Sequence, residues 1–461
     1  MIIIFTIKII PPIIIFIVKI IIGGIFMKDI IQQIMVDFQN SELPQPAARE
    51  INFPKLKKNL LKAHVLVGMR RSGKTWTMYQ EMHNLLSQGV TRQQLVYLNF
   101  EDDRLLPFNA TDFQSILEAY FELWPQYANS NEVYFFLDEI HEIPGWEKFI
   151  RRLLDQEKIQ IYISGSSAKL LSKEIATTLR GRTITQEIFP FNFREYLLIK
   201  RQTFPATLTT KQKANLANHA KNFFYYGGFP ETIGAEKTLH RRLLQNYIDI
   251  VIFRDVIERH QIANTTMVRE FIRYCLHNIS SWLSVNRLFQ RFKSQGKTIG
   301  KNSLYEFMQY LEDAYCIFAI PLYTLSLQQQ NLNPKKIFCI DQGLITAYSM
   351  KQDFEDAARL ENIIFCKLRR KTEKIFYYKT RQNQEVDFLV ISEQNKMTLI
   401  QACVSLAKEN IYKREINALK QAMQELKIKQ GYIVTISDKQ TITTPYGKIT
   451  VLPLWEWLLY D

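Results

Sequence analysis

A glycine-rich loop within residues 64–75, HVLVGMRRSGKT, constrains the fold of this chain more than any other feature. Four residues separate Gly68 from Gly73-Lys74-Thr75, which is the spacing of a phosphate-binding P-loop. A β-branched strand pattern precedes the loop and a helical pattern comes after it, as this motif requires. Glycines let backbone N–H groups approach phosphate oxygens where a side chain would block them. The stretch predicts a nucleotide-binding α/β domain, with an ordinary glycine turn as the alternative.

The side chains of the loop have the chemistry that a nucleotide needs. Lys74 would bind the β and γ phosphates as a point charge, and Thr75 would hold Mg²⁺ through its hydroxyl. The start of the next helix adds partial positive charge. The residues expected to bind nucleotide are Gly68, Met69, Arg70, Arg71, Ser72, Gly73, Lys74 and Thr75. ATP and Mg²⁺ are the expected ligands.

A second motif comes after the strand predicted over residues 133–137. There Asp138 and Glu139 end an apolar run, and an acid at the end of a buried strand is costly unless it meets a cation. Asp138 would therefore hold Mg²⁺, and Glu139 would orient or deprotonate the attacking water. The start of a solvated loop is the alternative. Residues 94–100 form a further strand pattern between the two motifs, and we expect this strand to be inserted between theirs in the sheet.

Residues 1–26 are intensely apolar and do not resemble the rest of the chain. As a membrane helix the segment is interrupted by two consecutive prolines, Lys8 and Lys19. As a secretory signal it lacks a clear small-residue cleavage site. A third interpretation is that translation starts at Met27, where a normal amphipathic pattern begins. We favour this internal start, and we expect membrane contact only if the first 26 residues are real.

Charge and cysteine usage narrow the choice of partners and compartment. The chain has 59 Lys and Arg against 45 Asp and Glu, a net charge of +14 and a pI near 9.3. This balance suits a polyanionic partner such as DNA, and a generally basic surface is the alternative. The 5 cysteines show neither a C-x-x-C pair nor a Cys/His ligand spacing. We therefore expect reduced cysteines, no zinc and a cytoplasmic protein.

Several stretches together carry a family resemblance. They are GMRRSGKT, LNFEDDRL (98–105), FFLDEIHEIPGWEKFIRRL (135–153), ISGSSAKLLSKEIATTLRGR (163–182), FPFNFREYL (189–197), YYGGFPE (225–231), YIDIVIFRDVIERHQI (247–262) and RLENIIFCKLRR (359–370). The combination resembles a family of prokaryotic AAA-superfamily predicted ATPases. In that family an AAA domain precedes a carboxyl-terminal domain of unknown function related to restriction endonucleases. The resemblance covers nearly everything after Met27.

The resemblance implies further catalytic residues after the strand that ends at residue 163. Ser166 is the residue we expect to act as a polar sensor of the γ-phosphate or the water, and a helix cap is the alternative. Arg180 and Arg182 flank Gly181, and either could supply positive charge to a γ-phosphate. The phosphate could belong to the same subunit or to a neighbour in a homo-oligomer. A salt bridge to a nearby carboxylate is the alternative for these arginines.

The middle region has helix-spaced apolar residues from about 209 to 323. Helices over 284–292 and 303–314 could form a winged-helix arrangement, which the resemblance also implies. The second helix carries Glu306, Glu312 and Asp313, and these acids would repel DNA phosphates. A protein-packing role therefore stays open beside DNA binding.

The last region resembles restriction-type endonucleases, which place an acid on a helix, an Asp at a strand end and Glu/Gln-x-Lys on the next strand. The residues in these three places are Glu361, Asp387 and Gln401. Cys403 stands where the lysine belongs, so nuclease chemistry is disfavoured even if the fold and a degenerate metal pocket persist. Lys413 or Arg414 on the next helix could replace the lysine, although a solvated helix face is as good an explanation.

The predicted architecture is α/β in three parts, after the apolar segment 1–26. An AAA-type P-loop domain with a parallel sheet spans 27–205, a helical, winged-helix-like region spans 206–345, and a small restriction-endonuclease-like α/β domain spans 346–461. The predicted function is a Mg²⁺-dependent ATPase whose nucleotide cycle controls a DNA- or protein-interacting carboxyl-terminal domain. The alternatives are a nucleotide-gated binding switch with little turnover and an ATP-dependent nuclease.

Overall fold

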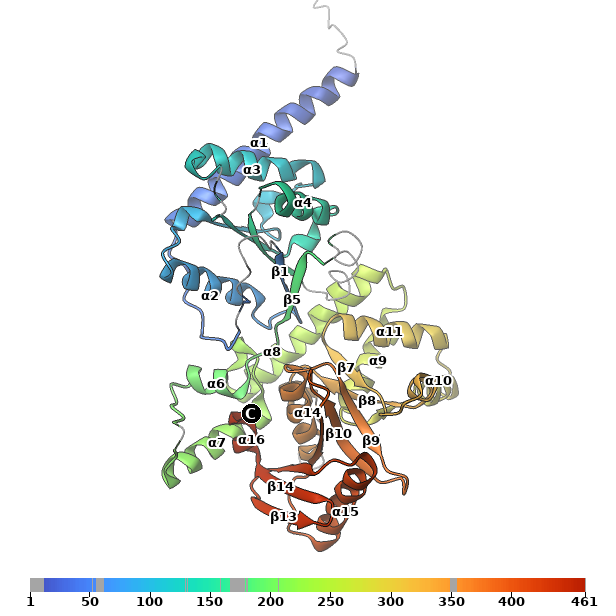
Figure 1. The fold of residues 1–461 in the computed structure, drawn as a ribbon. Coiled ribbons are helices and arrows are strands. Elements are labelled where there is room, and N and C mark those ends of the chain that lie inside the picture. Colours follow the sequence, from blue (N-terminus) through green and yellow to red (C-terminus); the bar gives the residue numbers. More distant parts are fainter. Residues whose placement is uncertain are drawn as a thin grey trace, which may run out of the picture.

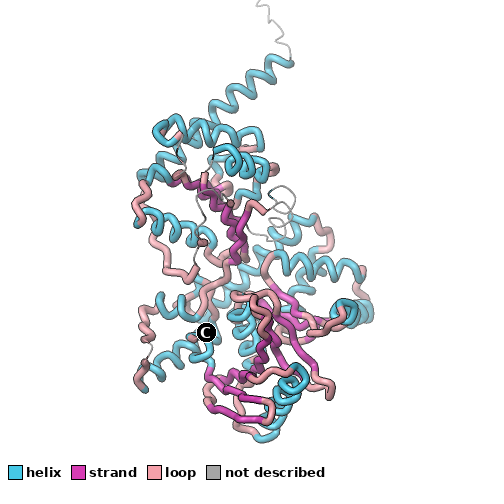
Figure 2. The backbone as a smooth tube through the Cα atoms, in the orientation of Figure 1, coloured by secondary structure: helices cyan, strands magenta, loops and turns pink. Residues whose placement is uncertain are grey.

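In the part of the chain that the computed structural model describes, three sheets succeed one another along the sequence (Figure 1). The described residues are 12–51, 53–54, 62–128, 130, 132–157, 159–165, 179, 181–205, 207–348 and 355–460, and the side chains of residues 12–25 and 331 are not described. Figure 2 shows the strands of the first and last sheets in separate regions, with helices between them.

The first sheet is parallel and carries the P-loop. Its strands are β1 (Ala63–Val67), β2 (Leu95–Asn99), β3 (Tyr134–Asp138), β4 (Gln160–Gly165) and β5 (Thr183–Glu187), in the order β2-β3-β4-β1-β5. Neighbouring strands pair in parallel throughout. Val65 and Val67 belong to one hydrophobic cluster and Leu66 to another, because successive side chains on a strand alternate between its faces. Both faces are thus covered, as is usual for parallel sheets.

The order of the strands corrects one prediction. The strand between the P-loop strand β1 and the Asp138 strand β3 is β4, whereas β2 lies at the edge of the sheet beyond β3. Residues 94–100 are a strand as expected, but they are not the inserted one. The prediction was wrong because crossover connections set the order of strands in a parallel sheet, and sequence order alone does not.

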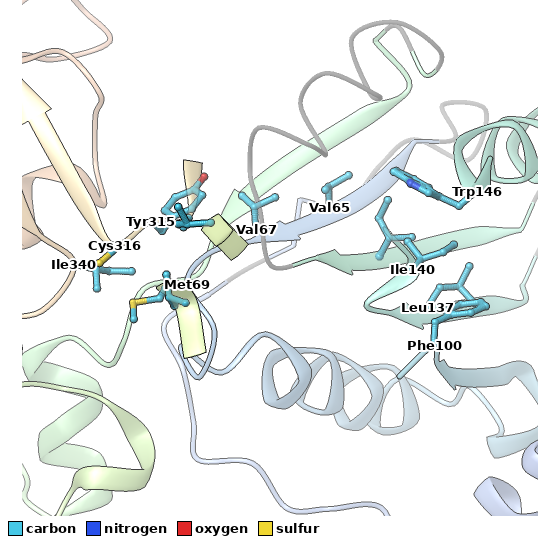
Figure 3. Packing of buried hydrophobic residues seen from close by; sticks show 14 of the residues in the cluster. Val65, Val67, Met69, Phe100, Leu137, Ile140, Trp146, Tyr315, Cys316 and Ile340 are labelled. Carbon is cyan, nitrogen blue, oxygen red and sulfur yellow. The ribbon is translucent and has the colours of Figure 1, made fainter. Parts of the chain in front are cut away.

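Helices pack on both faces of this sheet. The helix α2 (Lys74–Ser87) contributes Met78 and Met82 to the cluster that contains Leu66. On the other face lie α1 (Pro12–Asn40), α3 (Phe113–Leu123) and α4 (Trp146–Arg152), and Figure 3 shows Trp146 beside the strands. None of the described helices combines the length and apolarity needed to span a bilayer. The expected internal start at Met27 stays a prediction, and residues 1–11 lie outside the described residues.

The middle part is mainly helical. After α6 (Phe193–Ile199), which precedes the predicted boundary at 205, its helices are α7 (Thr210–Tyr226), α8 (Lys237–Ile250), the π-helical segment η9 (Val251–Glu258), α9 (Thr265–His277), α10 (Val285–Ser294), α11 (Lys301–Asp313), α12 (Leu327–Leu332) and α13 (Gly343–Tyr348). The strands β6 (Trp282–Leu283), β7 (Ile317–Ile320) and β8 (Lys335–Cys339) form a small antiparallel sheet in the order β6-β8-β7. The two helices expected within 284–314 are therefore present as α10 and α11.

The last part is a six-stranded mixed sheet with helices on both faces. Its strands are β9 (Ile375–Lys379), β10 (Glu385–Ile391), β11 (Met397–Ala402), β12 (Gln430–Thr435), β13 (Gln440–Thr444) and β14 (Gly447–Pro453), in the order β13-β14-β12-β11-β10-β9. The helices α14 (Asp356–Arg369) and α16 (Leu454–Leu459) pack into one hydrophobic cluster, and α15 (Glu409–Leu426) packs into another.

The hydrophobic clusters cross the predicted domain boundaries. Phe193 and Phe223 pack 5.6 Å apart on either side of the boundary at 205. Phe338 of β8 stacks on Phe365 of α14 at 4.5 Å and lies 5.5 Å from Phe388 of β10. Strand β8 is therefore built into the core of the last part, although it belongs to the preceding sheet.

Candidate active site

The glycine-rich loop connects the end of β1 to the start of α2. Gly68 has a φ of +151°, and a Cβ there would lie 2.3 Å from the carbonyl oxygen of Ile188. Gly73 has a φ of +99°, in the left-handed region that favours glycine. The two glycines of the motif are thus required by backbone conformation and by close packing.

Lys74 is the first residue of α2, and its side chain contacts the backbone of this loop. Its Nζ donates hydrogen bonds to the carbonyl oxygens of Gly68 (3.2 Å) and Met69 (3.5 Å), and its side chain is only 5% exposed. The same nitrogen lies 3.7 Å from Oε1 of Glu139. The P-loop cation and the acid at the end of β3 therefore belong to one site.

Asp138 is surrounded by hydroxyl groups. Thr75 Oγ1 donates to Asp138 Oδ2 at 2.6 Å, and the Tyr97 hydroxyl donates to the same oxygen at 3.1 Å. Ser164, on the adjacent strand β4, donates to Oδ1. Hydroxyl and carboxylate oxygens are the ligands that Mg²⁺ prefers, and Thr75 and Asp138 lie close enough to share one ion. The residues present thus fit the cation that the P-loop implies.

Glu139 is held beside Asp138 in a buried position. Its backbone N–H donates to Ser164 Oγ at 2.9 Å. Its Oε2 lies 3.3 Å from His141 Nδ1 but accepts no hydrogen bond from the described residues. Burial raises the pKa of Glu139 to about 7, against the opposing charge of Lys74. Burial also lowers the pKa of His141 to about 3, so this imidazole is neutral. Glu139 can therefore exchange a proton near neutral pH, as a general base must.

The two arginines of the loop contact carboxylates. Arg70 Nε lies 3.2 Å from both oxygens of Asp255 in η9, and its Nη1 lies 3.1 Å from Glu101 Oε1. Arg71 Nη1 lies 2.9 Å from Glu231 Oε1. Asp255 and Glu231 both belong to the middle part, so the P-loop is ion-paired to that part directly.

A cavity of about 370 Å³ opens over the loop. Among the residues that line it are Arg70, Arg71, Lys74, Thr75, Glu139 and Tyr247. The cavity thus joins the loop, Glu139 directly after β3, and helix α8 of the middle part. A ligand held by Lys74 would contact both parts of the chain.

The remaining catalytic candidates of the first part have different positions. Ser166 and Arg180 lie outside the described residues. Arg182 Nε pairs with Asp155 Oδ1 at 3.0 Å, which is the salt bridge that the sequence left open as an alternative. Ser164 contacts Asp138 directly, although the sequence pattern favoured Ser166 and both serines lie at the end of the same apolar strand pattern.

Two of the three residues proposed for a metal pocket in the last part, Glu361 and Asp387, meet around a lysine. Nζ of Lys336, on β8, lies 2.6 Å from Glu361, 2.9 Å from Asp387 and 3.0 Å from Glu385. Gln401 Oε1 accepts a hydrogen bond from the backbone of Asp387 at 3.2 Å. Burial alone would lower the pKa of Lys336, but its three carboxylate partners raise it well above the ordinary value. Within the described residues no group of three or more His, Cys, Asp or Glu is arranged to hold a metal ion.

The lysine of this cluster comes from an element that the sequence had not indicated. Neither of the two candidates on α15 is the cation of the cluster, since Lys413 pairs with Glu409 and Arg414 with Glu415. The lysine comes instead from β8, in the preceding sheet. Cys403 is a buried thiol whose pKa is raised to about 11 by burial. The signal that could have identified Lys336 is a lysine directly before the apolar run of a strand, KIFCI.

Known proteins match each part of the chain. A family model described as an AAA domain matches residues 61–197. Models described as domains of unknown function, DUF8612 and DUF4143, match residues 217–355 and 357–457. An uncharacterized protein of Methanocaldococcus jannaschii is 33% identical over 409 residues, covering 86% of this chain and 88% of the relative. An uncharacterized protein of Haemophilus influenzae is 27% identical over 397 residues, covering 86% of this chain and 94% of the relative.

Solved structures are more distant. The Walker-type ATPase of Pyrococcus abyssi is 13% identical and has a TM-score of 0.38, with 67% of this chain and 99% of that chain covered. The ORC2 protein of Aeropyrum pernix, in its ADP form, is 13% identical with a TM-score of 0.30, covering 67% of this chain and 89% of that chain. The AAA match and the parallel sheet confirm the predicted α/β fold of the P-loop type, with a helical middle and a small mixed sheet after it.

Proposed function

Because the chain belongs to the same protein family as its uncharacterized relative from Methanocaldococcus jannaschii and carries an AAA domain, we propose that it is a Mg²⁺-dependent ATPase. One observation carries the proposal. Lys74, Thr75, Asp138 and Glu139 converge at the carboxyl ends of two strands of one sheet, and a cavity opens over the loop that holds Lys74 and Thr75. These residue types are the ones that bind phosphate, hold Mg²⁺ and activate water in P-loop ATPases.

The chain's own residues divide the work of hydrolysis. Lys74 and the backbone N–H groups of the loop bind the β and γ phosphates. Thr75 and Asp138 would hold Mg²⁺, which supplies charge neutralisation on the phosphates. Glu139 takes a proton from the attacking water through Oε2, the oxygen that accepts no hydrogen bond among the described residues. Ser164 fixes the site by contacting the Asp138 side chain and the Glu139 backbone together.

A nucleotide-gated switch with little turnover is the second candidate. Lys74 already lies 3.7 Å from Glu139, and both arginines of the loop already have carboxylate partners. In this switch a bound phosphate would compete with these contacts, so binding of nucleotide itself would change how the first and middle parts are held together. Turnover would then serve only to reset the switch.

The finer assignments stay proposals. We propose that residues 27–205, 206–345 and 346–461 act as three units, that the last one is restriction-endonuclease-like, and that it contacts DNA or a protein under control of the nucleotide. We also propose a cytoplasmic location and a homo-oligomer. Nuclease activity is disfavoured, because Lys336 already occupies the space among Glu361, Glu385 and Asp387.

ATP hydrolysis measured with and without DNA separates these functions when the DNA is then inspected for cuts. The ATPase proposal expects Mg²⁺-dependent turnover, and Glu139→Gln should bind ATP yet lower turnover by about 100-fold or more. Hydrolysis at the wild-type rate by Glu139→Gln would contradict its role as the base. Tight ATP binding with negligible turnover by the wild type would favour the switch. DNA that is cut by the wild type but left intact by Asp387→Ala would instead support the nuclease.

A further inference from the structure

Arg70 has a position that its place in the P-loop does not explain. The loop needs glycines and Lys74 for phosphate binding, yet the Arg70 side chain is turned toward the middle part and is only 18% exposed. Its Nε lies 3.2 Å from both oxygens of Asp255, and its Nη1 lies 3.1 Å from Glu101. Two carboxylates on different elements thus fix the guanidinium in one orientation.

The guanidinium lines the same cavity as Lys74 and Glu139. Its positive charge acts on Glu139, where it joins Lys74 in opposing the effect of burial on the pKa of that carboxyl. A phosphate that Lys74 holds in this cavity shares the cavity with Arg70. Arginine is the side chain best suited to charge that develops on a transferred phosphoryl group, because its planar fork offers several donors.

Two other described arginines are less suited to this role. Arg182 pairs with Asp155. Arg71 also lines the cavity, but its side chain is 53% exposed and its partner Glu231 is 49% exposed, so solvent screens their interaction. Arg70 is the less exposed arginine of the loop, with 18% of its side chain exposed, so its charge acts at a lower dielectric than that of Arg71.

Asp255 is a specific anchor for this arginine. Its side chain is 3% exposed, and it lies in η9, a π-helical segment, a form of helix that is often found at functional sites. Met69, next to Arg70, is fully buried in the hydrophobic cluster that also contains Cys316 and Ile340 of the middle part (Figure 3). Apolar packing and an ion pair therefore tie this half of the loop to the middle part.

From these contacts we propose that Arg70 supplies, within the same chain, positive charge to the transferred phosphate, and that Asp255 of the middle part aims it. Arg70 is then a catalytic residue and Asp255 a positioning residue. The inference rests on the proposed ATPase function and adds a regulatory consequence. A displacement of η9 would move Asp255, and turnover would fall while nucleotide stays bound.

The test compares Arg70→Ala, Asp255→Asn and the double variant in the full-length protein. Turnover is measured by phosphate release, and the affinities for ATP and ADP are measured by calorimetry. Arg70→Ala should lower kcat by about 1000-fold, as removal of an arginine finger does, with the Kd of ATP changed only a few-fold. Asp255→Asn should lower kcat by about 10-fold, because Glu101 still holds the guanidinium.

The double variant distinguishes positioning of Arg70 by Asp255 from a general loss of structure. It removes both charges together, so no buried carboxylate is left unpaired, and its kcat should equal that of Arg70→Ala. Arg254→Ala is the matched control, since Arg254 is adjacent to Asp255 on η9 but 65% exposed and paired with Glu258 along its own helix. It should keep the wild-type kcat.

The inference is overturned by additive losses in the double variant, by a weaker ATP affinity with unchanged kcat in Arg70→Ala, or by near wild-type turnover of the double variant. Absence of hydrolysis by the wild type would reject the ATPase function and this inference with it. Normal hydrolysis by the wild type and by Arg70→Ala would reject only the role of the arginine.

Discussion

Two sites in this chain hold a buried lysine near at least one carboxylate, and the two lysines differ in how many carboxylates surround them. Lys74 donates mainly to two backbone carbonyls and has one carboxylate at 3.7 Å, with a cavity beside it. Lys336 has three carboxylates within 3.0 Å. The charge of Lys74 can still interact with a ligand, whereas the charge of Lys336 is neutralised by carboxylates of the protein. The number of counterions, and not the residue type, separates a binding site from an internal ion cluster.

The largest expected effect is that of Lys74→Ala. Few groups of the protein neutralise the charge of the wild-type lysine, so this charge should interact strongly with the bound phosphates. We expect no measurable hydrolysis and a loss of ATP affinity of about 100-fold or more, because a charged hydrogen bond contributes about 1.5–3 kcal/mol. Calorimetry with ATP checks this. An unchanged ATP affinity would show that Lys74, like Lys336, does not bind the ligand, and the two lysines would then no longer differ in role.

Lys336→Met should have the opposite pattern, a loss of stability without a loss of ATP affinity. Removing the lysine leaves three carboxylates without their cation, and breaking a buried pair costs about 3–5 kcal/mol. Hydrogen exchange of β10 and denaturant unfolding measure the change. Lys335→Met is the matched control, because Lys335 is the exposed neighbour on the same strand, and it should change stability by less than about 0.5 kcal/mol.

This comparison also shows how far the sequence could predict the molecule. The P-loop and Asp138-Glu139 were predictable because each is a contiguous motif, and parallel strands bring their carboxyl ends to one edge. Lys336 was not, because its partner Asp387 is 51 residues away and the pairing depends on how β8 packs against β10.

Sheet order and register account for the other differences. The inserted strand is β4 rather than β2, since the crossovers that decide this leave no local signal. Ser164 contacts Asp138 because Leu137 pairs with Ile163 in the parallel register, which sets the next residues of the two strands side by side. Both sites therefore depend on contacts between elements that no single motif records.

The third prediction concerns pH, since burial raises the pKa of a carboxyl at both sites. Glu139 must lose its proton to act as a base, so kcat/KM should fall about tenfold per pH unit below about 7. Glu139→Gln should remove this dependence. The free energy of unfolding should depend on pH in the opposite direction. The folded state binds the proton more tightly than the unfolded one between pH 4.5 and about 7, so ionisation of Glu139 lowers stability as pH rises through this window.

For Glu361 the corresponding window extends to about pH 8. Lys336→Met should therefore be less destabilising at pH 6 than at pH 8.5, because protonation relieves the uncompensated charge. Equal losses of stability at the two pH values would show that the carboxylates do not depend on the lysine for their charge balance.

The smallest effect is expected for Glu231→Gln, which tests whether burial is what makes these ion pairs matter. Arg71 and Glu231 lie 2.9 Å apart, a shorter distance than that between Arg70 and Asp255, but both side chains are about half exposed. Water and salt then screen the charges, so the variant should change stability by less than about 1 kcal/mol, and less at high salt. Glutamine can still accept the hydrogen bond from Tyr247, which isolates the charge as the only change. Denaturant unfolding at two salt concentrations measures it. A loss of stability as large as that of Lys336→Met would mean that the distance between the charged groups matters more than their burial. The difference between Lys74 and Lys336 would then need another explanation.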